Sequence, residues 1–135
     1  MRMRAYAVEQ ASVLLNRLAL RINRASRLAD PDSIHDLRVA IRRFTQCIRV
    51  FRQFFPAREF GRIRRRLRRI MRLAAGIRNR DIALQLCEEA GLGPNSAAAL
   101  SLAQERIESR RELVERLDRF RKRELSRKRR KRLGL

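Results

Sequence analysis

The sequence is poor in the residue types that most catalytic and metal sites require. It has one histidine, two cysteines and no tryptophan among 135 residues. Cys47 and Cys87 lie in apolar surroundings of helical periodicity and lack the spacing of metal ligands. We therefore expect two reduced cysteines that pack half-buried in a cytosolic protein. Because aromatic side chains are few, the core must be filled mainly by aliphatic residues.

Patterns of catalytic residues are missing as well. The sequence has no paired carboxylates, no serine or cysteine beside a base, no cluster of metal ligands and no glycine-rich phosphate loop. The sequence therefore predicts a protein that is not an enzyme and that uses neither a cofactor nor a metal.

Long apolar runs are also absent. No stretch approaches the ~20 apolar residues that cross a bilayer. Residues 1–11 are charged and contain no apolar run of signal-peptide length. We expect a cytoplasmic protein without a membrane partner.

Acidic residues are scarce in proportion to basic ones. Lys and Arg number 35 against 14 Asp and Glu, which gives a formal net charge of +21. Three of the 35 are lysines and 32 are arginines, and residues 38–80 contain 15 arginines with Glu59 as the single acidic residue. A genome rich in arginine codons would account for the Arg/Lys ratio but not for the net charge. Because arginine binds phosphate and carboxylate in a bidentate manner, the composition indicates a polyanionic partner that relieves self-repulsion.

Proline and glycine are sparse, which favours long helices. Prolines occur at positions 31, 56 and 94, and glycines at 61, 76, 91, 93 and 134. Between them, apolar residues recur at helical spacing and never alternate. We predict helices over residues 4–28, 33–55, 58–75, 81–90 and 95–126, with a break or kink at 76–79. The predicted fold class is an all-α antiparallel bundle of four to five helices, in a single domain spanning residues 1–135.

Local signals refine these helices. Ser33 stands three residues before Asp36, which is the capping-box spacing, and is expected to open the second helix. In the last helix, glutamates and arginines surround a stripe that is expected to lie in the core: Leu100, Ile107, Leu113, Val114 and Leu117. The basic tail from about residue 121 to residue 132 is expected to be frayed or disordered.

Basic residues form two rows at helical spacing. The second helix has one row on the face opposite its apolar residues. Its members lie within roughly 60° of one another around the helix axis and are His35, Arg38, Arg42 and Arg49. On the third helix, opposite the apolar seam, lie Arg62, Arg65, Arg69 and Arg72. Two such helices side by side would form a groove lined with guanidinium groups. The alternative is that both rows are the solvated faces of a very basic protein.

Two sequence elements resemble the CHAD domain, the conserved histidine α-helical domain. The first is residues 35–44, in which His35 is followed by arginines three, seven and eight residues later. The second is the segment Gly-Ile-Arg-Asn-Arg-Asp-Ile at residues 76–82. The chain departs from the family at Thr45, where another basic residue is frequent, and at Ala75, where glycine is usual.

This resemblance implies an all-helical fold with a basic cavity that binds inorganic polyphosphate without catalysing its turnover. The phosphate-facing residues it implies are His35, Arg38, Arg42, Arg43, Arg49, Arg69, Arg72 and Arg78. It also implies a location in the cytoplasm, with association to polyphosphate granules. Family members resemble two pseudo-symmetric helical halves, each with its own histidine element, and this chain has one such element. We therefore expect half of a two-repeat domain that pairs with a second copy as a homodimer.

Two other interpretations remain open. The first is a nucleic-acid-binding helical protein that places residues 58–72 or the tail 121–132 on a phosphate backbone. The scarcity of aromatic residues argues against stacking on single strands, and no base-reading helix is apparent. The second is a coiled-coil scaffold built on the last helix, which Arg110 and Arg121 at seam positions disfavour.

Overall fold

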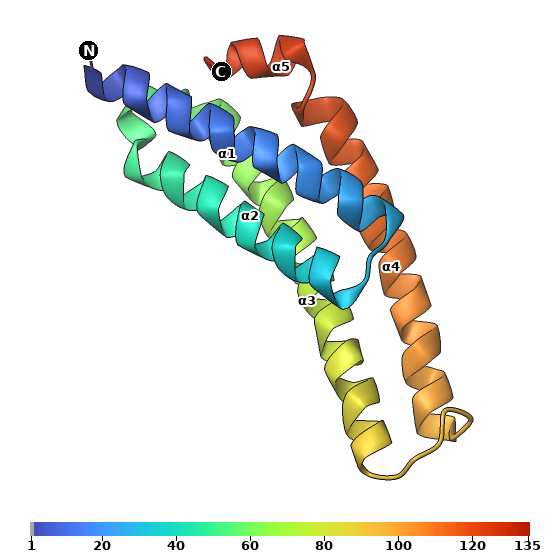
Figure 1. Ribbon diagram of the computed structural model, residues 1–135. Coiled ribbons are helices and arrows are strands. Elements are labelled where there is room, and N and C mark those ends of the chain that lie inside the picture. Colours follow the sequence, from blue (N-terminus) through green and yellow to red (C-terminus); the bar gives the residue numbers. More distant parts are fainter. Residues whose placement is uncertain (1) are drawn as a thin grey trace.

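The structure, a computed structural model, describes residues 2–135 (Figure 1). This part of the chain forms five α-helices and one 3₁₀ helix, and it has no strand. In chain order the elements are α1 (Arg2–Arg27), α2 (Pro31–Val50), the 3₁₀ helix η1 (Arg52–Phe54), α3 (Ala57–Glu89), α4 (Ala97–Glu124) and α5 (Arg127–Arg132). The predicted all-α fold class is confirmed.

The helices are arranged as two antiparallel hairpins. Contacts are densest between α1 and α2 and between α3 and α4, while α2–α3 and α1–α4 contacts join the two hairpins (Figure 1). The largest fully buried side chains come from all four long helices and are Phe44, Phe120, Leu15, Leu18, Ile22, Ile34, Leu37, Ile63, Leu67, Ile70, Ile77 and Leu113. Burying such a side chain stabilises the fold by roughly 1.5–3 kcal/mol relative to exposure, so this core is the main stabilising term.

The turn between α1 and α2 differs from the capping-box prediction. The N-cap is Asp30, whose carboxylate accepts a hydrogen bond from the Ser33 N–H at 2.9 Å. The helix therefore begins at Pro31, where the missing N–H costs nothing. The hydrogen bonds with Ser33 lower the pKa of the Asp30 carboxyl. The buried Ala29 closes the turn in the left-handed region, at φ 48°.

Of the break or kink predicted at residues 76–79, the break is wrong, because α3 runs without interruption from Ala57 to Glu89. Its apolar seam continues through the region, where Ile70, Ala74 and Ile77 are all buried. A glycine inside a helix costs only about 1 kcal/mol relative to alanine, which this packing outweighs. The Arg80 guanidinium also donates to the Gly76 carbonyl at 3.0 Å and bridges that turn of the helix.

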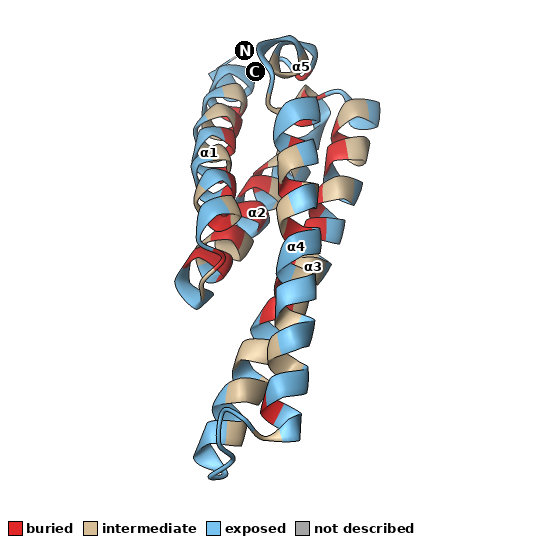
Figure 2. Ribbon diagram, turned by 90° about the vertical axis from the view of Figure 1, so that its right-hand side faces the viewer, coloured by how far each residue is buried: buried red, intermediate tan, exposed pale blue. Residues whose placement is uncertain are grey.

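The α3–α4 hairpin extends past the end of the α1–α2 hairpin (Figure 1). Near the α1–α2 turn, Arg106 of α4 donates a hydrogen bond to the Ala29 carbonyl at 2.8 Å. Beyond this point buried residues become scarce (Figure 2). Leu117 is buried as predicted, but Leu100 and Ile107 are each 53% exposed. The prediction that these two belong to the core is wrong, because Leu100 lies in the part of α4 that protrudes past the α1–α2 hairpin and the Ile107 side chain is open to solvent.

The basic tail, expected to be frayed or disordered, is helical in the structure. Residues up to Glu124 extend α4, and Ser126 then caps α5 by accepting a hydrogen bond from the Arg129 N–H at 3.3 Å. The Leu133 side chain is buried, and Arg130 donates a hydrogen bond to Asn16 of α1. One apolar anchor and a side-chain contact therefore dock α5 beside α1.

The fold bears on two expectations drawn from composition, those for the cysteines and for membrane-spanning segments. Cys47 is buried and Cys87 is partly buried, and both thiols are free in the described part of the chain. Across residues 2–135, no helix is both long enough and apolar enough to cross a membrane.

Candidate anion-binding groove

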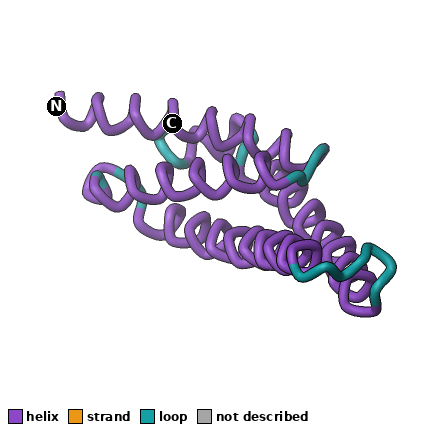
Figure 3. The backbone as a smooth tube through the Cα atoms, turned by 60° about the horizontal axis from the view of Figure 1, so that its bottom comes forward, coloured by secondary structure: helices purple, strands orange, loops and turns teal. Residues whose placement is uncertain are grey.

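A groove of about 760 Å³ is lined by residues of α2, η1 and α3, whose backbone course is shown in Figure 3. Its apolar lining comes from the edge of the core: Ile41, Phe44, Ile48, Phe55, Phe60, Ile63, Leu67 and Met71. Its charged lining consists of Arg42, Arg49, Arg52, Arg64 and Arg68. The described residues of the lining include no carboxylate. A concave surface with this lining attracts anions.

Next to the groove, Arg38, Arg42 and Arg78 bring like charges together from α2 and α3. Burial, followed by the charges of Arg42 and Arg78, lowers the pKa of the Arg38 guanidinium. The Arg38 Nε atom is buried, and no hydrogen-bond acceptor in residues 2–135 reaches it. Because like charges repel and a buried donor costs free energy when unpaired, an external anion would stabilise this cluster.

The structure separates the site residues predicted on α2. Arg42 and Arg49 line the groove, and Arg38 belongs to the adjoining cluster. His35 is exposed and lies almost one turn before Arg38 on the same helix. Arg43 is exposed and does not line the groove, because it is turned by about 100° from Arg42 around the helix axis.

On α3, the groove is lined by different arginines from those predicted. Arg69 and Arg72 are exposed and do not line it, whereas Arg64 and Arg68 do. The predicted row lies opposite the apolar seam and so faces solvent. The residues that line a groove lie at the boundary between the apolar seam and the solvent-exposed face. Arg64 and Arg68 hold such positions, three residues before and one residue after the buried Leu67. This position beside the seam was a signal present in the sequence.

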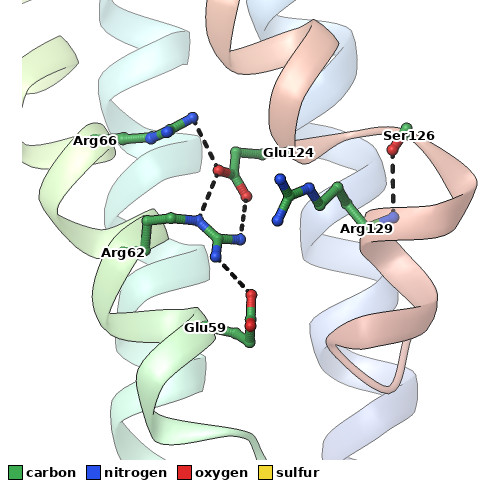
Figure 4. Close-up of polar contacts among 6 residues, drawn as sticks. All are labelled: Glu59, Arg62, Arg66, Glu124, Ser126 and Arg129. Atoms are coloured by element: carbon green, nitrogen blue, oxygen red, sulfur yellow. Dashed lines mark hydrogen bonds and ion pairs between the residues drawn. The ribbon is translucent and has the colours of Figure 1, made fainter.

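Arg62, another member of the predicted row, is directed toward α4 instead (Figure 4). Its guanidinium donates two hydrogen bonds of 3.1 Å to the carboxylate of Glu124, which is 1% exposed. Arg66 lies 3.0 Å from the same carboxylate, and Glu59 lies 2.7 Å from Arg62. The hydrogen bond to Glu124, partly opposed by burial, raises the pKa of Arg62. This cluster joins α3 to the end of α4 and is structural.

Acidic side chains serve as ion-pair partners of arginines. Asp36, on α2, lies 3.6 Å from the Arg21 guanidinium and 3.9 Å from that of Arg24, both on α1.

Within the described residues, no group of three His, Cys, Asp or Glu side chains is placed to hold a metal ion.

Fold and groove together define a class of protein, an all-α bundle that presents an arginine-lined groove. The chain belongs to the CHAD domain family, whose family model matches residues 9–134. Domains of this family are linked in general to polyphosphate binding. No curated protein and no solved structure matches the chain.

Proposed function

We propose that this protein binds inorganic polyphosphate, without turning it over, at the Arg38–Arg42–Arg78 cluster and the arginine-lined edge of the adjoining α2–α3 groove. The observation that carries the proposal is the buried Arg38 Nε, which no acceptor in residues 2–135 reaches, beside two further guanidinium groups. A phosphate oxygen would satisfy that donor and offset the repulsion. The general link of the family to polyphosphate supports the choice of ligand.

The spacing of the arginines suits a linear polyanion. Side chains one helical turn apart are about 5–6 Å from one another, which is close to the repeat of phosphates along an extended chain. Each guanidinium can hold two phosphate oxygens. Affinity should arise largely from charge neutralisation and counterion release, so it should fall steeply as salt rises.

The exposed residues implied by the family resemblance have a secondary place in this proposal. His35, Arg43, Arg69 and Arg72 would contact only a chain long enough to continue beyond the groove. Short polyphosphates should therefore be insensitive to substitution of these four residues, while long chains should lose some affinity.

Competition at fixed salt tests the ligand. Labelled polyphosphate is bound first, and unlabelled polyphosphate, duplex DNA and RNA are then added at equal phosphate concentration. Polyphosphate should displace the label at the lowest concentration. Preference for either nucleic acid would overturn the proposal.

Nucleic-acid binding is the second candidate, and a different surface favours it. Arg65, Arg69 and Arg72 are exposed on α3 outside the groove, and α5 consists entirely of basic residues. A duplex phosphate backbone could follow such a convex surface. If this candidate is correct, Arg69→Ala with Arg72→Ala will weaken binding more than Arg38→Ala with Arg42→Ala.

We also propose a homodimer and a cytoplasmic location at polyphosphate granules. The apolar part of the groove lining supports a second copy, which would cover it. Fluorescence microscopy of the tagged chain, in cells with and without polyphosphate synthesis, tests the location. Diffuse signal in both cells would contradict it.

A further inference from the structure

The end of the α3–α4 hairpin has a composition unlike the rest of the chain. Residues 82–105, named here the hairpin tip, contain no lysine or arginine, although the whole chain has 35. The acidic residues of the tip are Glu88, Glu89 and Glu105. The tip is therefore a segment of net negative charge in a protein of net charge +21.

The hairpin tip also exposes large apolar side chains. Ile82 and Leu86 of α3 are 44% and 58% exposed, and Leu100 of α4 is 53% exposed. An ion pair between Asp81 and Arg106 marks where the tip begins. Beyond that pair the two helices protrude past the α1–α2 hairpin (Figure 1). The tip thus presents an apolar surface that α1 and α2 leave uncovered.

The groove has a matching feature that phosphate does not explain. Its lining includes Ile48, Phe60 and Met71 as well as arginines. A phosphate chain is strongly hydrated and gains nothing from contact with apolar side chains. An apolar surface without cations would suit this part of the groove, because the neighbouring Arg64 and Arg68 would repel cations.

We propose that the hairpin tip of a second copy docks in the apolar part of the groove. The tip and the groove of one copy cannot meet, because α3 is a continuous helix in which Arg64 and Ile82 are ~27 Å apart along the axis. The tip combines apolar side chains with glutamates and has no cation, so its charge complements the groove. A two-fold arrangement makes this contact twice and closes the assembly at a dimer.

This inference rests on the proposed homodimer and not on polyphosphate binding. Of the three clustered arginines only Arg42 lines the groove, so Arg38 and Arg78 stay available for phosphate when a tip is docked. The predicted dimer and the predicted polyphosphate binding can therefore be contradicted independently of each other.

Light scattering after size exclusion, without polyphosphate, tests the tip. Ile82→Asp with Leu86→Asp should raise the dimer dissociation constant at least about 100-fold, because both side chains would become buried charges. The matched control is Leu20→Asp with Val50→Asp. The native side chains at these positions are 67% and 69% exposed, and they lie outside the hairpin tip and the groove. The control should remain dimeric, and circular dichroism should show both variants folded.

Gly61→Leu tests the groove. Gly61 lines the groove, and a Cβ atom there would meet only Arg65 NH1, at 3.7 Å, so the helix can accept a side chain. Leucine would fill the groove while improving helix propensity. This variant should be monomeric at concentrations at which the unsubstituted chain is dimeric, and circular dichroism should show it folded.

Mixing the two monomeric variants tests directly whether the tip of one copy binds the groove of another. The mixture retains one unmodified tip and one unmodified groove, so a heterodimer should form with weaker affinity than the native dimer. A monomeric native chain would overturn both the homodimer and this inference. A dimer that survives the tip or groove substitutions, or a mixture that stays monomeric, would overturn the inference alone. Normal dimerisation without polyphosphate binding would contradict only the proposed ligand.

Discussion

Arg38 shows how one side chain can indicate a ligand. Its guanidinium lies beside Arg42 and Arg78, and its buried Nε has no acceptor within the described chain. Native proteins pair most buried polar atoms, so an unpaired donor next to a groove points to something that binds there. The neighbouring charges make that ligand an anion.

The first prediction concerns these arginines. Arg38→Ala with Arg42→Ala should weaken polyphosphate binding at least about tenfold more than Arg17→Ala with Arg111→Ala, because charge-assisted contacts are worth about 1.5–3 kcal/mol. Both pairs remove two charges, and the control arginines are exposed on α1 and α4. Fluorescence anisotropy at fixed salt measures the difference. Equal losses would mean that binding is diffuse.

The second prediction concerns the thiols. Burial raises the pKa of Cys47, so little thiolate is present near neutral pH. Cys47 should react with a disulfide reagent at least about tenfold more slowly than the partly buried Cys87. The rates are followed in the folded protein, with the denatured chain as the control. Equal rates in the folded protein would contradict the burial of Cys47.

At the scale of elements, α3 is the central feature of the molecule. It contributes Arg64 and Arg68 to the groove, Arg62 to the buried ion cluster and Arg78 to the arginine cluster around Arg38. An uninterrupted helix holds these four residues in a fixed relation, so the continuity of α3 through Gly76 matters for the geometry of the proposed site.

The third prediction tests that continuity. Gly76→Ala should raise the free energy of unfolding by up to about 1 kcal/mol, because alanine is the better helix former. The new Cβ atom would lie 3.3 Å from Arg80 NH1, which is the flexible end of a side chain and can shift. Urea denaturation measures the change. Destabilisation would indicate that residues 76–79 are not helical in solution.

The fourth prediction concerns the ion cluster between α3 and α4. Glu124→Gln should lower the free energy of unfolding by about 2 kcal/mol, since it leaves Arg62 and Arg66 without their shared carboxylate. The value is below that of a fully buried pair because both arginines are about one-quarter to one-third exposed. Glu112→Gln, exposed on the same helix, is the control. Equal urea midpoints for the two variants would contradict the assigned role.

At the scale of the whole molecule, charge is distributed unevenly. The net charge of +21 opposes compaction, yet the hairpin tip contributes none of the positive charge. A polyanion would therefore act on the body of the protein and not on the tip, and it would stabilise the folded state by neutralising the arginines.

The fifth prediction follows from this distribution. Polyphosphate at about 100 times its dissociation constant should stabilise the protein by about 2.7 kcal/mol, which raises Tm by roughly 5–10 °C. The shift should shrink as salt increases, because counterion release then contributes less. Differential scanning fluorimetry measures it. A shift of equal size in Arg38→Ala with Arg42→Ala would contradict a defined site.

The sequence by itself determined the secondary structure class, the apolar seams and the row of basic residues on α2. Helical periodicity and charge are local properties, so His35, Arg38, Arg42 and Arg49 could be placed on a common face without knowing any partner. The same locality allowed the CHAD family to be identified from residues 35–44 and 76–82, and the family model confirms it.

The tertiary structure alone decided which arginines of α3 meet the α2 row. Arg64 and Arg68 line the groove, while Arg69 and Arg72 face solvent, because the position of α2 sets the boundary of the exposed face. It also decided the burial of Glu124, whose arginine partners are about 60 residues away in sequence. Such contacts depend on how helices pack, and helical periodicity describes each helix only separately.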